Sequence, residues 1–146
     1  MSSTSLIVGS TGLIGKKLIF ELAKKNSEVI AITRRSISNL PENVSLLDIN
    51  FDDFLKNGSF PSCDHIYICL GTTIKKAGSQ SEFKKVDFDY CVSFAKKARE
   101  VGATKISLIS SVGASPYVNN FYLKTKGEVE EEIKKIDFQV INIFRP

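Results

Sequence analysis

The sequence predicts an α/β fold with a doubly wound parallel sheet in a single domain, residues 1–146, and three observations support this prediction. Six short apolar segments alternate with helical ones, the order that a parallel sheet with crossover helices requires. The first of these segments passes through three closely spaced glycines into a helix. With 146 residues and no internal repeat, the chain is long enough to form one core.

The opening segment, Ser5–Lys17, reads SLIVGSTGLIGKK and contains the strand, the glycines and the start of the helix. A helix start leaves backbone N–H groups unpaired at the positive end of the helix dipole, so it binds phosphate well. Gly9 can form a turn closed to most side chains, Gly12 lets a pyrophosphate approach the backbone, and Gly15 lets the helix lie close to the strand. The spacing therefore predicts the first turn of a dinucleotide-binding βαβ unit.

The other elements follow from the apolar pattern. Five further strands are predicted at Glu28–Thr33, Val44–Ile49, Asp64–Leu70, Lys105–Ser110 and Phe138–Phe144. Helices are predicted at about 12–25, over Phe83–Val101, where apolar residues recur at helical spacing, and over Tyr122–Lys135. In the last helix, Glu130–Lys134 and Glu131–Lys135 are expected to form ion pairs four residues apart. Right-handed crossovers then give a Rossmann sheet with strand order 3-2-1-4-5-6, covered on both faces.

Composition excludes several classes of function. The net charge of +4 comes from lysine pairs on the polar faces of predicted helices, which does not indicate a nucleic-acid groove. Cys63, Cys69 and Cys91 suit reduced, buried thiols, and Cys63 with His65, the single histidine, is too little for a metal site. No signal peptide and no run long enough to span a bilayer is apparent. We therefore expect a soluble cytoplasmic protein that binds neither nucleic acid nor membranes.

The end of the second predicted strand bears on the choice of cofactor. A sheet of this kind that prefers NAD usually carries an acidic residue about 20 residues past the glycines, where it takes the ribose 2′-hydroxyl. Here the strand ends in Thr33, Arg34 and Arg35, and two guanidinium groups suit a 2′-phosphate. The sequence thus predicts NADP(H) in preference to NAD(H). Asp48, which ends the third strand, either accepts from the adenine amino group or caps the turn that follows.

Four residues suggest proton transfer coupled to hydride transfer. Ser110 and Ser111 end the fifth strand, and Tyr122 and Lys126 lie one turn apart on the helix that follows. A nearby ammonium and a positive nicotinamide ring favour the phenolate of a tyrosine, whose pKa is otherwise about 10. Tyr122 would then give a proton to a carbonyl oxygen as hydride arrives, and Lys126 would hold the nicotinamide ribose. One of the serine hydroxyls would hydrogen-bond the same oxygen.

Together these motifs resemble the short-chain dehydrogenase/reductase superfamily, and most of all its atypical NAD(P)H-binding branch, which includes the Tat-interacting oxidoreductase-like proteins. The likeness extends over nearly the whole chain. The segments that carry it are GSTGLIG, ITRR, CLGTTIKKAG, FKKVDFDY, LISSVGA, YLKTKGEVE and the terminal FRP.

The resemblance also implies which residues contact the cofactor. Those implied at the pyrophosphate are Gly9, Ser10, Thr11, Gly12, Leu13, Ile14 and Gly15. Arg34 would lie at the adenosine phosphate, and Leu70, Gly71 and Thr72 would lie along the cofactor. The implied catalytic set is Tyr122, Lys126 and one serine, for which we prefer Ser111 over Ser110 because it directly precedes the VGA turn.

Members of this family generally continue well past the FRP segment with elements that close the substrate pocket, whereas this sequence ends at Pro146. We therefore expect a dinucleotide-binding domain that lacks the usual C-terminal substrate lobe. A truncated sheet edge would expose apolar surface, which favours a second copy of the chain or a protein partner there.

Two functions fit these expectations. The first is an NADP(H)-dependent oxidoreductase of a small carbonyl or alcohol substrate, and the alternative is a non-catalytic NADPH-binding regulatory or protein-interaction module. Nucleotide-sugar epimerisation or dehydration would use the same serine, tyrosine and lysine, but it needs a larger substrate lobe.

Overall fold

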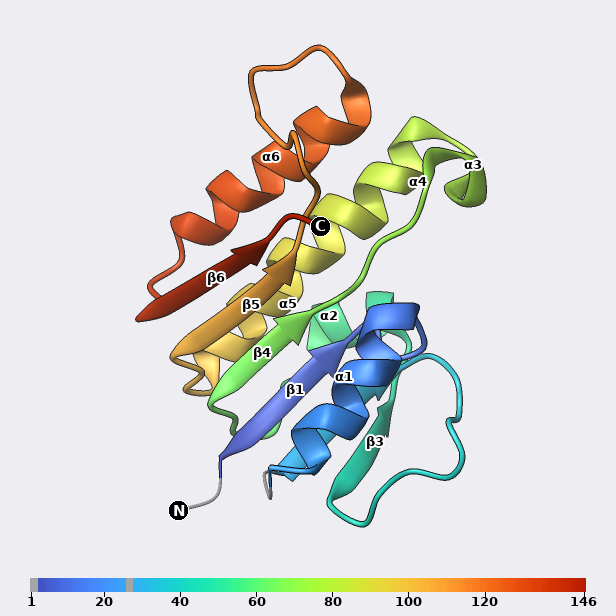
Figure 1. Ribbon diagram of the computed structural model, residues 1–146, viewed down its shortest axis with the longest axis vertical. Helices are drawn as coiled ribbons and strands as arrows, with labels where there is room; N and C mark the ends of the chain where they lie inside the picture. Colours follow the sequence, from blue (N-terminus) through green and yellow to red (C-terminus); the bar gives the residue numbers. More distant parts are fainter. Residues whose placement is uncertain (1–2, 26–27) are drawn as a thin grey trace.

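Six parallel strands form one sheet in the order β3-β2-β1-β4-β5-β6, which confirms the predicted Rossmann topology (Figure 1). The computed structural model describes residues 3–25 and 28–146. The strands are β1 (Thr4–Val8), β2 (Glu28–Thr33), β3 (Val44–Asp48), β4 (His65–Ile68), β5 (Lys105–Ile109) and β6 (Val140–Phe144). Their parallel register brings the carboxyl ends of all six strands to one edge of the sheet.

The helices differ more from the prediction than the strands do. They are α1 (Leu13–Ala23), α2 (Phe51–Asn57), α3 (Ile74–Ala77), α4 (Gln80–Lys84), the π-helical segment η1 (Lys85–Tyr90), α5 (Cys91–Glu100) and α6 (Phe121–Lys134). The single helix expected over 83–101 is thus interrupted by a π-helical turn. The sequence pattern does not predict the short helices α2 and α3, because what marks them is a capping residue and not an apolar period. At their N-termini the side chains of Asn50 and Thr73 accept hydrogen bonds from the backbone N–H groups three residues further along.

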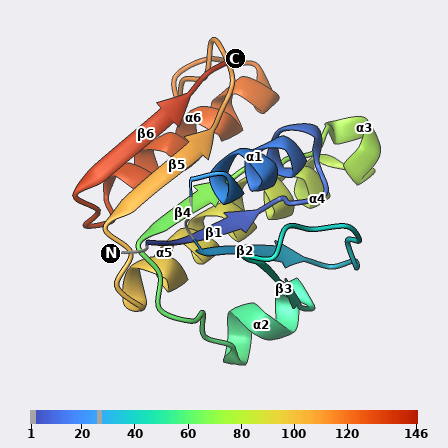
Figure 2. The ribbon, with the colours of Figure 1, turned by 60° about the horizontal axis from the view of Figure 1, so that its bottom comes forward.

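Helices cover the two faces of the sheet unequally. Of the helices in the described residues, Figures 1 and 2 show α2, α4, α5 and α6 on one face and only α1 on the other. The larger core lies on the first face, where Phe94 and Ile106 are fully buried. The smaller core lies between α1 and the β1–β2 half of the sheet, around Ile7 and Ile19.

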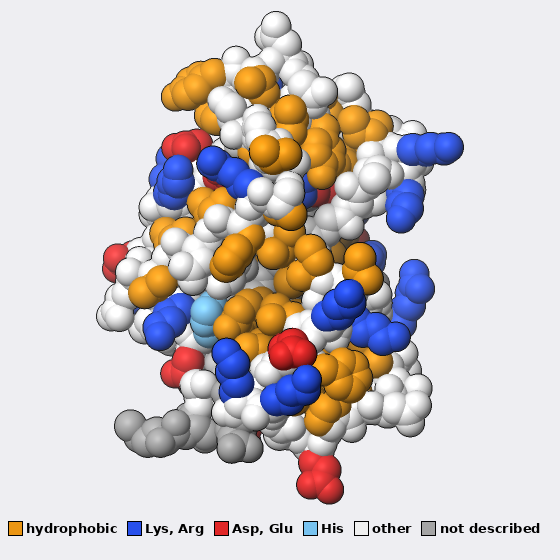
Figure 3. All heavy atoms as spheres, viewed as in Figure 1, with side chains coloured by type: hydrophobic (Ala, Val, Ile, Leu, Met, Phe, Trp, Pro, Cys, Tyr) orange, Lys and Arg blue, Asp and Glu red, His pale blue; other side chains and the backbone are white. Residues whose placement is uncertain are grey.

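On the α1 side, strands β4, β5 and β6 therefore line an open groove. Its cavity measures about 360 Å³ and lies over alternate residues of these strands, among them His65, Ser107 and Asn142. Figure 3 shows hydrophobic side chains gathered in the middle of this face, with lysine and arginine around them and the histidine at one side. His65 stacks on Tyr67 with ring centres 3.9 Å apart, and its Nε2 lies 2.8 Å from the Ser107 hydroxyl.

Candidate functional site

The glycine turn after β1 is shaped by close backbone packing. Gly9 has φ of +88°, and a Cβ there would lie 2.6 Å from the backbone of Cys69. A Cβ on Gly15 would lie 2.1 Å from the carbonyl oxygen of Gly9. In contrast, a Cβ on Gly12 would meet only that oxygen, at 3.5 Å. Gly9 and Gly15 are therefore needed for the turn itself, whereas Gly12 keeps the space before α1 open.

The N-terminus of α1 faces this open space. Gly12 is its N-cap, and among the described residues no side chain caps the helix. The N–H groups of the first turn are thus available to an anion. Of the neighbouring side chains, Leu13 is 77% exposed, and Ile14 lines the open groove rather than the turn.

Ser10 holds the turn in place with its side chain. It is 1% exposed, and its hydroxyl lies 2.9 Å from the carbonyl oxygen of Ile7 and 3.0 Å from that of Ile32. These bonds tie the ends of β1 and β2 together. Only the backbone of Ser10 therefore remains for contact with a ligand.

Two exposed arginines follow β2 beside the glycine turn. The Thr33 hydroxyl accepts from the Arg35 N–H at 2.9 Å and donates to the Arg35 carbonyl oxygen at 2.6 Å, which fixes this corner. The Arg34 guanidinium lies 4.7 Å above the Phe51 ring, a cation–π contact that orients it. A cavity of about 50 Å³ lies here, lined by Gly9, Ser10, Thr11, Ile32, Thr33, Arg34, Arg35, Phe51 and Leu70. Asp48 is exposed at the end of β3 and is not among its lining residues.

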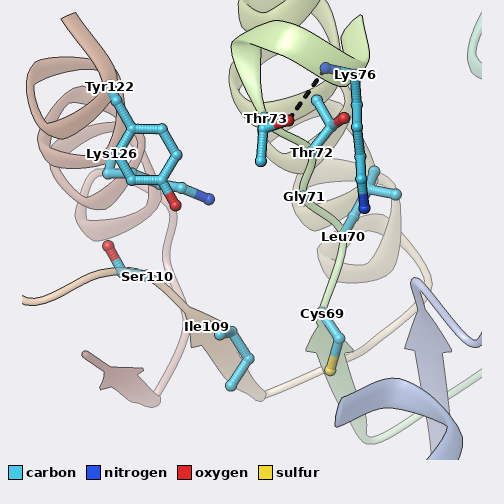
Figure 4. A pocket seen from close by; sticks show the side chains of 10 residues that line it. All are labelled: Cys69, Leu70, Gly71, Thr72, Thr73, Lys76, Ile109, Ser110, Tyr122 and Lys126. Carbon is cyan, nitrogen blue, oxygen red and sulfur yellow. Dashed lines mark hydrogen bonds between the residues drawn. The ribbon is translucent and has the colours of Figure 1, made fainter. Parts of the chain in front are cut away.

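A cavity of about 300 Å³, larger than the one beside Arg34, lies at the ends of β4 and β5. Its lining residues are Cys69, Leu70, Gly71, Thr72, Thr73, Lys76, Ile109, Ser110, Tyr122 and Lys126. In Figure 4, Tyr122 and Lys126 project from α6 on one side, the 70–73 segment lies opposite, and Ser110 lies below them. Because Leu70 lines both this cavity and the one beside Arg34, the two follow one another along the carboxyl edge of the sheet.

Of the two candidate serines, Ser110 lies at this cavity and Ser111 does not. The Ser110 hydroxyl donates to Glu130 Oε2 at 2.5 Å. Glu130 in turn accepts two bonds from the Arg145 guanidinium, one from Nε at 3.2 Å and one from Nη2. The Ser111 hydroxyl is half-buried and lies 3.4 Å from the Val112 carbonyl oxygen. The geometry thus favours Ser110, not the Ser111 that the sequence interpretation preferred.

The expected ion pairs of α6 are wrong. Glu130 does not pair with Lys134: it is 2% exposed and bound to Ser110 and Arg145. Lys134 instead pairs with Glu131 at 3.4 Å, three residues away. Burial opposes the charge on Glu130, but the hydrogen bonds from Arg145 and Ser110 outweigh it and lower the pKa of Glu130. The buried side chains of α6 therefore include Glu130, which the sequence interpretation had placed in an ion pair with Lys134.

Lys126 is held by a carboxylate that the sequence interpretation missed. Its Nζ lies 2.5 Å from Asp87 Oδ1 and 5.6 Å from the centre of the Tyr122 ring. Burial opposes the charge on Lys126, but the neighbouring Asp87 carboxylate raises the pKa of this lysine above its usual range. Two signals could have identified such residues: Tyr122, Lys126 and Glu130 follow at intervals of four, and Asp87 lies four residues after the core residue Phe83.

Within residues 3–25 and 28–146, no group of three or more histidine, cysteine or acidic side chains is placed to hold a metal ion. All three cysteines are free thiols. No helix in this part of the chain is long and apolar enough to cross a membrane.

Comparison with known proteins connects this geometry to a family. The family model described as "NAD dependent epimerase/dehydratase family" matches residues 5–134. The chain is 35% identical to rat Protein HTATIP2 over 146 residues, which covers 96% of this chain and 60% of that protein. It is 32% identical to the Saccharomyces cerevisiae "Protein FMP52, mitochondrial", covering 97% of this chain and 63% of the yeast protein. The chain thus spans less than two thirds of the length of these relatives.

Solved structures show the same fold. A putative NAD-dependent epimerase/dehydratase from Bacillus halodurans superposes with a TM-score of 0.80 at 24% identity, covering 99% of this chain and 70% of that one. The human epimerase family protein SDR39U1, solved with NADPH, gives 0.72 at 17% identity and covers 97% of this chain and 52% of that one.

The names of the relatives correct one expectation from the sequence. Five further fungal relatives in this comparison carry the same name as the yeast protein, which includes the word mitochondrial. The expected cytoplasmic location is therefore wrong by this comparison. It rests on the lack of a secretory signal peptide and on reduced cysteines, and both features are equally consistent with a reducing compartment other than the cytoplasm.

Proposed function

Because the chain belongs to the NAD-dependent epimerase/dehydratase family, we propose that it binds NADP(H) in preference to NAD(H) and acts as an oxidoreductase on a small carbonyl or alcohol substrate. One observation carries this proposal: two cavities that share Leu70 as a lining residue follow one another along the carboxyl edge of the sheet, from Arg34 to Tyr122. Ligands of open α/β sheets bind at this edge, where the strand order reverses between β1 and β4.

The diphosphate of the cofactor would lie against the first turn of α1. The open space at Gly12 admits it, and the uncapped N–H groups there would donate to its oxygens. The cavity beside Arg34 and Arg35 would take the adenosine ribose, with these guanidinium groups on its 2′-phosphate. Two arginines and no carboxylate at this cavity support NADP(H) over NAD(H).

The reaction itself would take place at the larger cavity. The bound dinucleotide supplies or accepts the hydride. In reduction, the Tyr122 hydroxyl would give its proton to the carbonyl oxygen, and the Lys126 ammonium would favour the phenolate left behind. Ser110 would donate to the same oxygen once its hydroxyl turns away from Glu130, and Lys126 would also bind the nicotinamide ribose. In the oxidative direction Tyr122 would take the proton from the alcohol.

A second candidate function is a non-catalytic NADPH-binding module that binds a protein partner or a second copy. The observation that favours it is the open groove over β4, β5 and β6, because an apolar hollow of this size on a sheet face suits another polypeptide. In this case the dinucleotide would bind as above, and no turnover would follow.

Titration with NADPH and NADH, followed by thermal unfolding, tests the proposal. NADPH at a hundred times its dissociation constant should stabilise the native state by about 2.7 kcal/mol, raising the melting temperature by about 5–10 °C. Tyr122→Phe should abolish NADPH oxidation in a screen of carbonyl compounds and leave cofactor affinity unchanged. Tyr117→Phe, at a loop position that is 92% exposed, is the control. NADPH binding without oxidation of any carbonyl by the intact protein would favour the module instead.

A further inference from the structure

Asp87 lies beneath the larger cavity, in the π-helical segment η1. Its side chain is fully buried. A π-helical turn is rare, and within α-helices it is often found at functional sites. The proton transfer proposed above makes no use of this carboxylate.

The two oxygens of Asp87 have different partners on different elements. Oδ1 accepts from the Lys126 ammonium of α6 at 2.5 Å, and Oδ2 accepts from the Thr72 backbone N–H at 3.0 Å. One carboxylate thus fixes α6 relative to the segment that follows β4. A lysine ammonium has three donors, so two N–H groups of Lys126 remain for a ligand.

Gly71, which lines the cavity, lies against this ion pair. A Cβ on Gly71 would lie 3.4 Å from Asp87 Oδ1 and 3.6 Å from Lys126 Nζ. Of the pair, Lys126 lines the cavity, and Asp87 lies behind Lys126 and Gly71.

A buried ion pair is a poor device for stability alone. Taking two charges out of water costs several kcal/mol per ion, and replacement by apolar residues is often neutral. Its location under the cavity, with a second bond to the segment that lines the opposite wall, favours a role in binding.

We propose that Asp87 is a positioning residue: it holds the Lys126 ammonium and the 70–73 segment at the separation that a nicotinamide ribose must fit. This inference rests on the proposed function, since it assigns the dinucleotide to this cavity. Asp87 does not touch the reacting atoms and acts through Lys126 and Thr72.

The groups that face Lys126 determine what loss of Asp87 would do. Besides Asp87, the titratable groups nearest its ammonium are Cys91 of α5 and Tyr122 of α6, and Lys76 and Cys69 line the same cavity. With a neutral residue at position 87, Lys126 would be buried without a counter-ion. Burial then disfavours the charged form, and the lysine loses its proton at a lower pH.

The test compares Asp87→Asn and Asp87→Glu with the wild type. Asparagine keeps an acceptor for Thr72 and removes the charge, whereas glutamate keeps the charge. The control is Asp52→Asn, which removes the charge of an exposed pair with Lys85 of the same segment η1, at 3.3 Å, and keeps an oxygen that can accept from the Tyr90 hydroxyl. Two quantities are measured: the titration of Lys126, followed by NMR of its ε-methylene group, and the NADPH dissociation constant between pH 7 and 9.5.

In Asp87→Asn, the ammonium of Lys126 should lose its proton at a pH at least about two units below the pH at which it does so in the wild type. Above that point NADPH affinity should fall about tenfold for each pH unit, while the wild type and Asp52→Asn stay nearly constant. Asp87→Glu should recover most of the affinity at pH 8.

Identical Lys126 titration in Asp87→Asn and the wild type would overturn the proposal. If the wild type binds no NADPH, the proposed function fails, whereas the Lys126 titration still shows whether Asp87 holds this lysine. If Asp87→Asn does not fold, the titration of Lys126 in the wild type tests the proposal. A pKa of Lys126 at or below the usual lysine value would show that Asp87 does not hold this lysine, and would overturn the proposal.

Discussion

Gly12 and Gly15 lie three residues apart in the same turn, yet their replacement by alanine should have different consequences: Gly15→Ala should lower stability, and Gly12→Ala should weaken NADPH binding. In Gly15→Ala the new Cβ would lie 2.1 Å from the Gly9 carbonyl oxygen and 2.9 Å from its carbonyl carbon. Both are backbone atoms, so α1 and the turn must separate by more than 1 Å to reach ordinary contact. Overpacking of this kind costs about 1–3 kcal/mol, and rigid backbone on both sides favours the upper figure.

In Gly12→Ala the nearest atom is at 3.5 Å, and Gly12 has φ of −75°, which alanine adopts without strain. Loss of unfolded-chain entropy would stabilise this variant by about 0.4–1 kcal/mol. Alanine is a poorer N-cap than glycine, which offsets much of that gain. The added methyl group would, however, occupy the space proposed for the diphosphate.

Thermal unfolding and NADPH calorimetry on both variants separate these effects. About 3 kcal/mol should lower the melting temperature of Gly15→Ala by about 6–12 °C, whereas Gly12→Ala should unfold within about 2 °C of the wild type. Gly12→Ala should bind NADPH at least about tenfold more weakly, a loss of about 1.4 kcal/mol. Equal destabilisation of the two variants would refute the packing argument. Wild-type NADPH affinity in Gly12→Ala would refute the proposed place of the diphosphate.

Three further outcomes are expected. Arg34→Ala should weaken NADPH binding by about 10–100-fold, since hydrogen bonds to charged groups contribute about 1.5–3 kcal/mol. The same substitution should change NADH binding by less than about twofold. Equal losses of affinity for the two cofactors, measured by calorimetry, would exclude a bond from Arg34 to the 2′-phosphate. Burial lowers the pKa of His65 to about 4. Below about pH 6.5 this histidine therefore binds a proton in the unfolded chain but not in the folded chain, so the free energy of unfolding decreases as the pH falls. Urea unfolding should show that the stability of the wild type falls between pH 7 and pH 5 by about 1–2 kcal/mol more than that of His65→Gln. In the same assay at pH 7, Glu130→Ala should lower the free energy of unfolding by about 2 kcal/mol, because it leaves Ser110 and Arg145 without their acceptor. Glu131→Ala, which removes an exposed ion pair, should change it by no more than about 0.5 kcal/mol. Similar values for the two variants would contradict the buried network.

The sheet could be predicted from the sequence because its strands are short apolar runs bounded by polar or glycine residues. Glu28–Thr33 is observed with the predicted bounds, and Lys105 begins β5 as expected. The strand order followed from the handedness of crossovers and the position of the glycine turn. The helices after β3 and β4 could not be predicted in this way. Their seven and four residues are too few for an apolar period to be recognised.

Only part of the candidate site could be predicted from the sequence. Groups that follow strand ends, such as Arg34 and Ser110, could be located, since parallel strands end at one edge. The side chains that hold them could not, because their partners are distant in the chain: Asp87 and Lys126 are 39 residues apart, and Ser110 and Glu130 are 20 apart. Surface pairing predicted for Glu130 by helical spacing was overridden by Arg145, which reaches it from the end of β6.

The unequal covering of the sheet should leave a pattern in how β5 tolerates substitution. Ile106 and Leu108 point into the larger core, whereas Ser107 lies on the opposite face, where it lines the open groove and is buried between His65 and Asn142. A saturation library scored for folding should therefore alternate along this strand, with Ile106 and Leu108 restricted to apolar side chains of similar size and the position between them accepting small polar ones. If a second polypeptide occupies that face in cells, the alternation would disappear there and persist in the isolated chain.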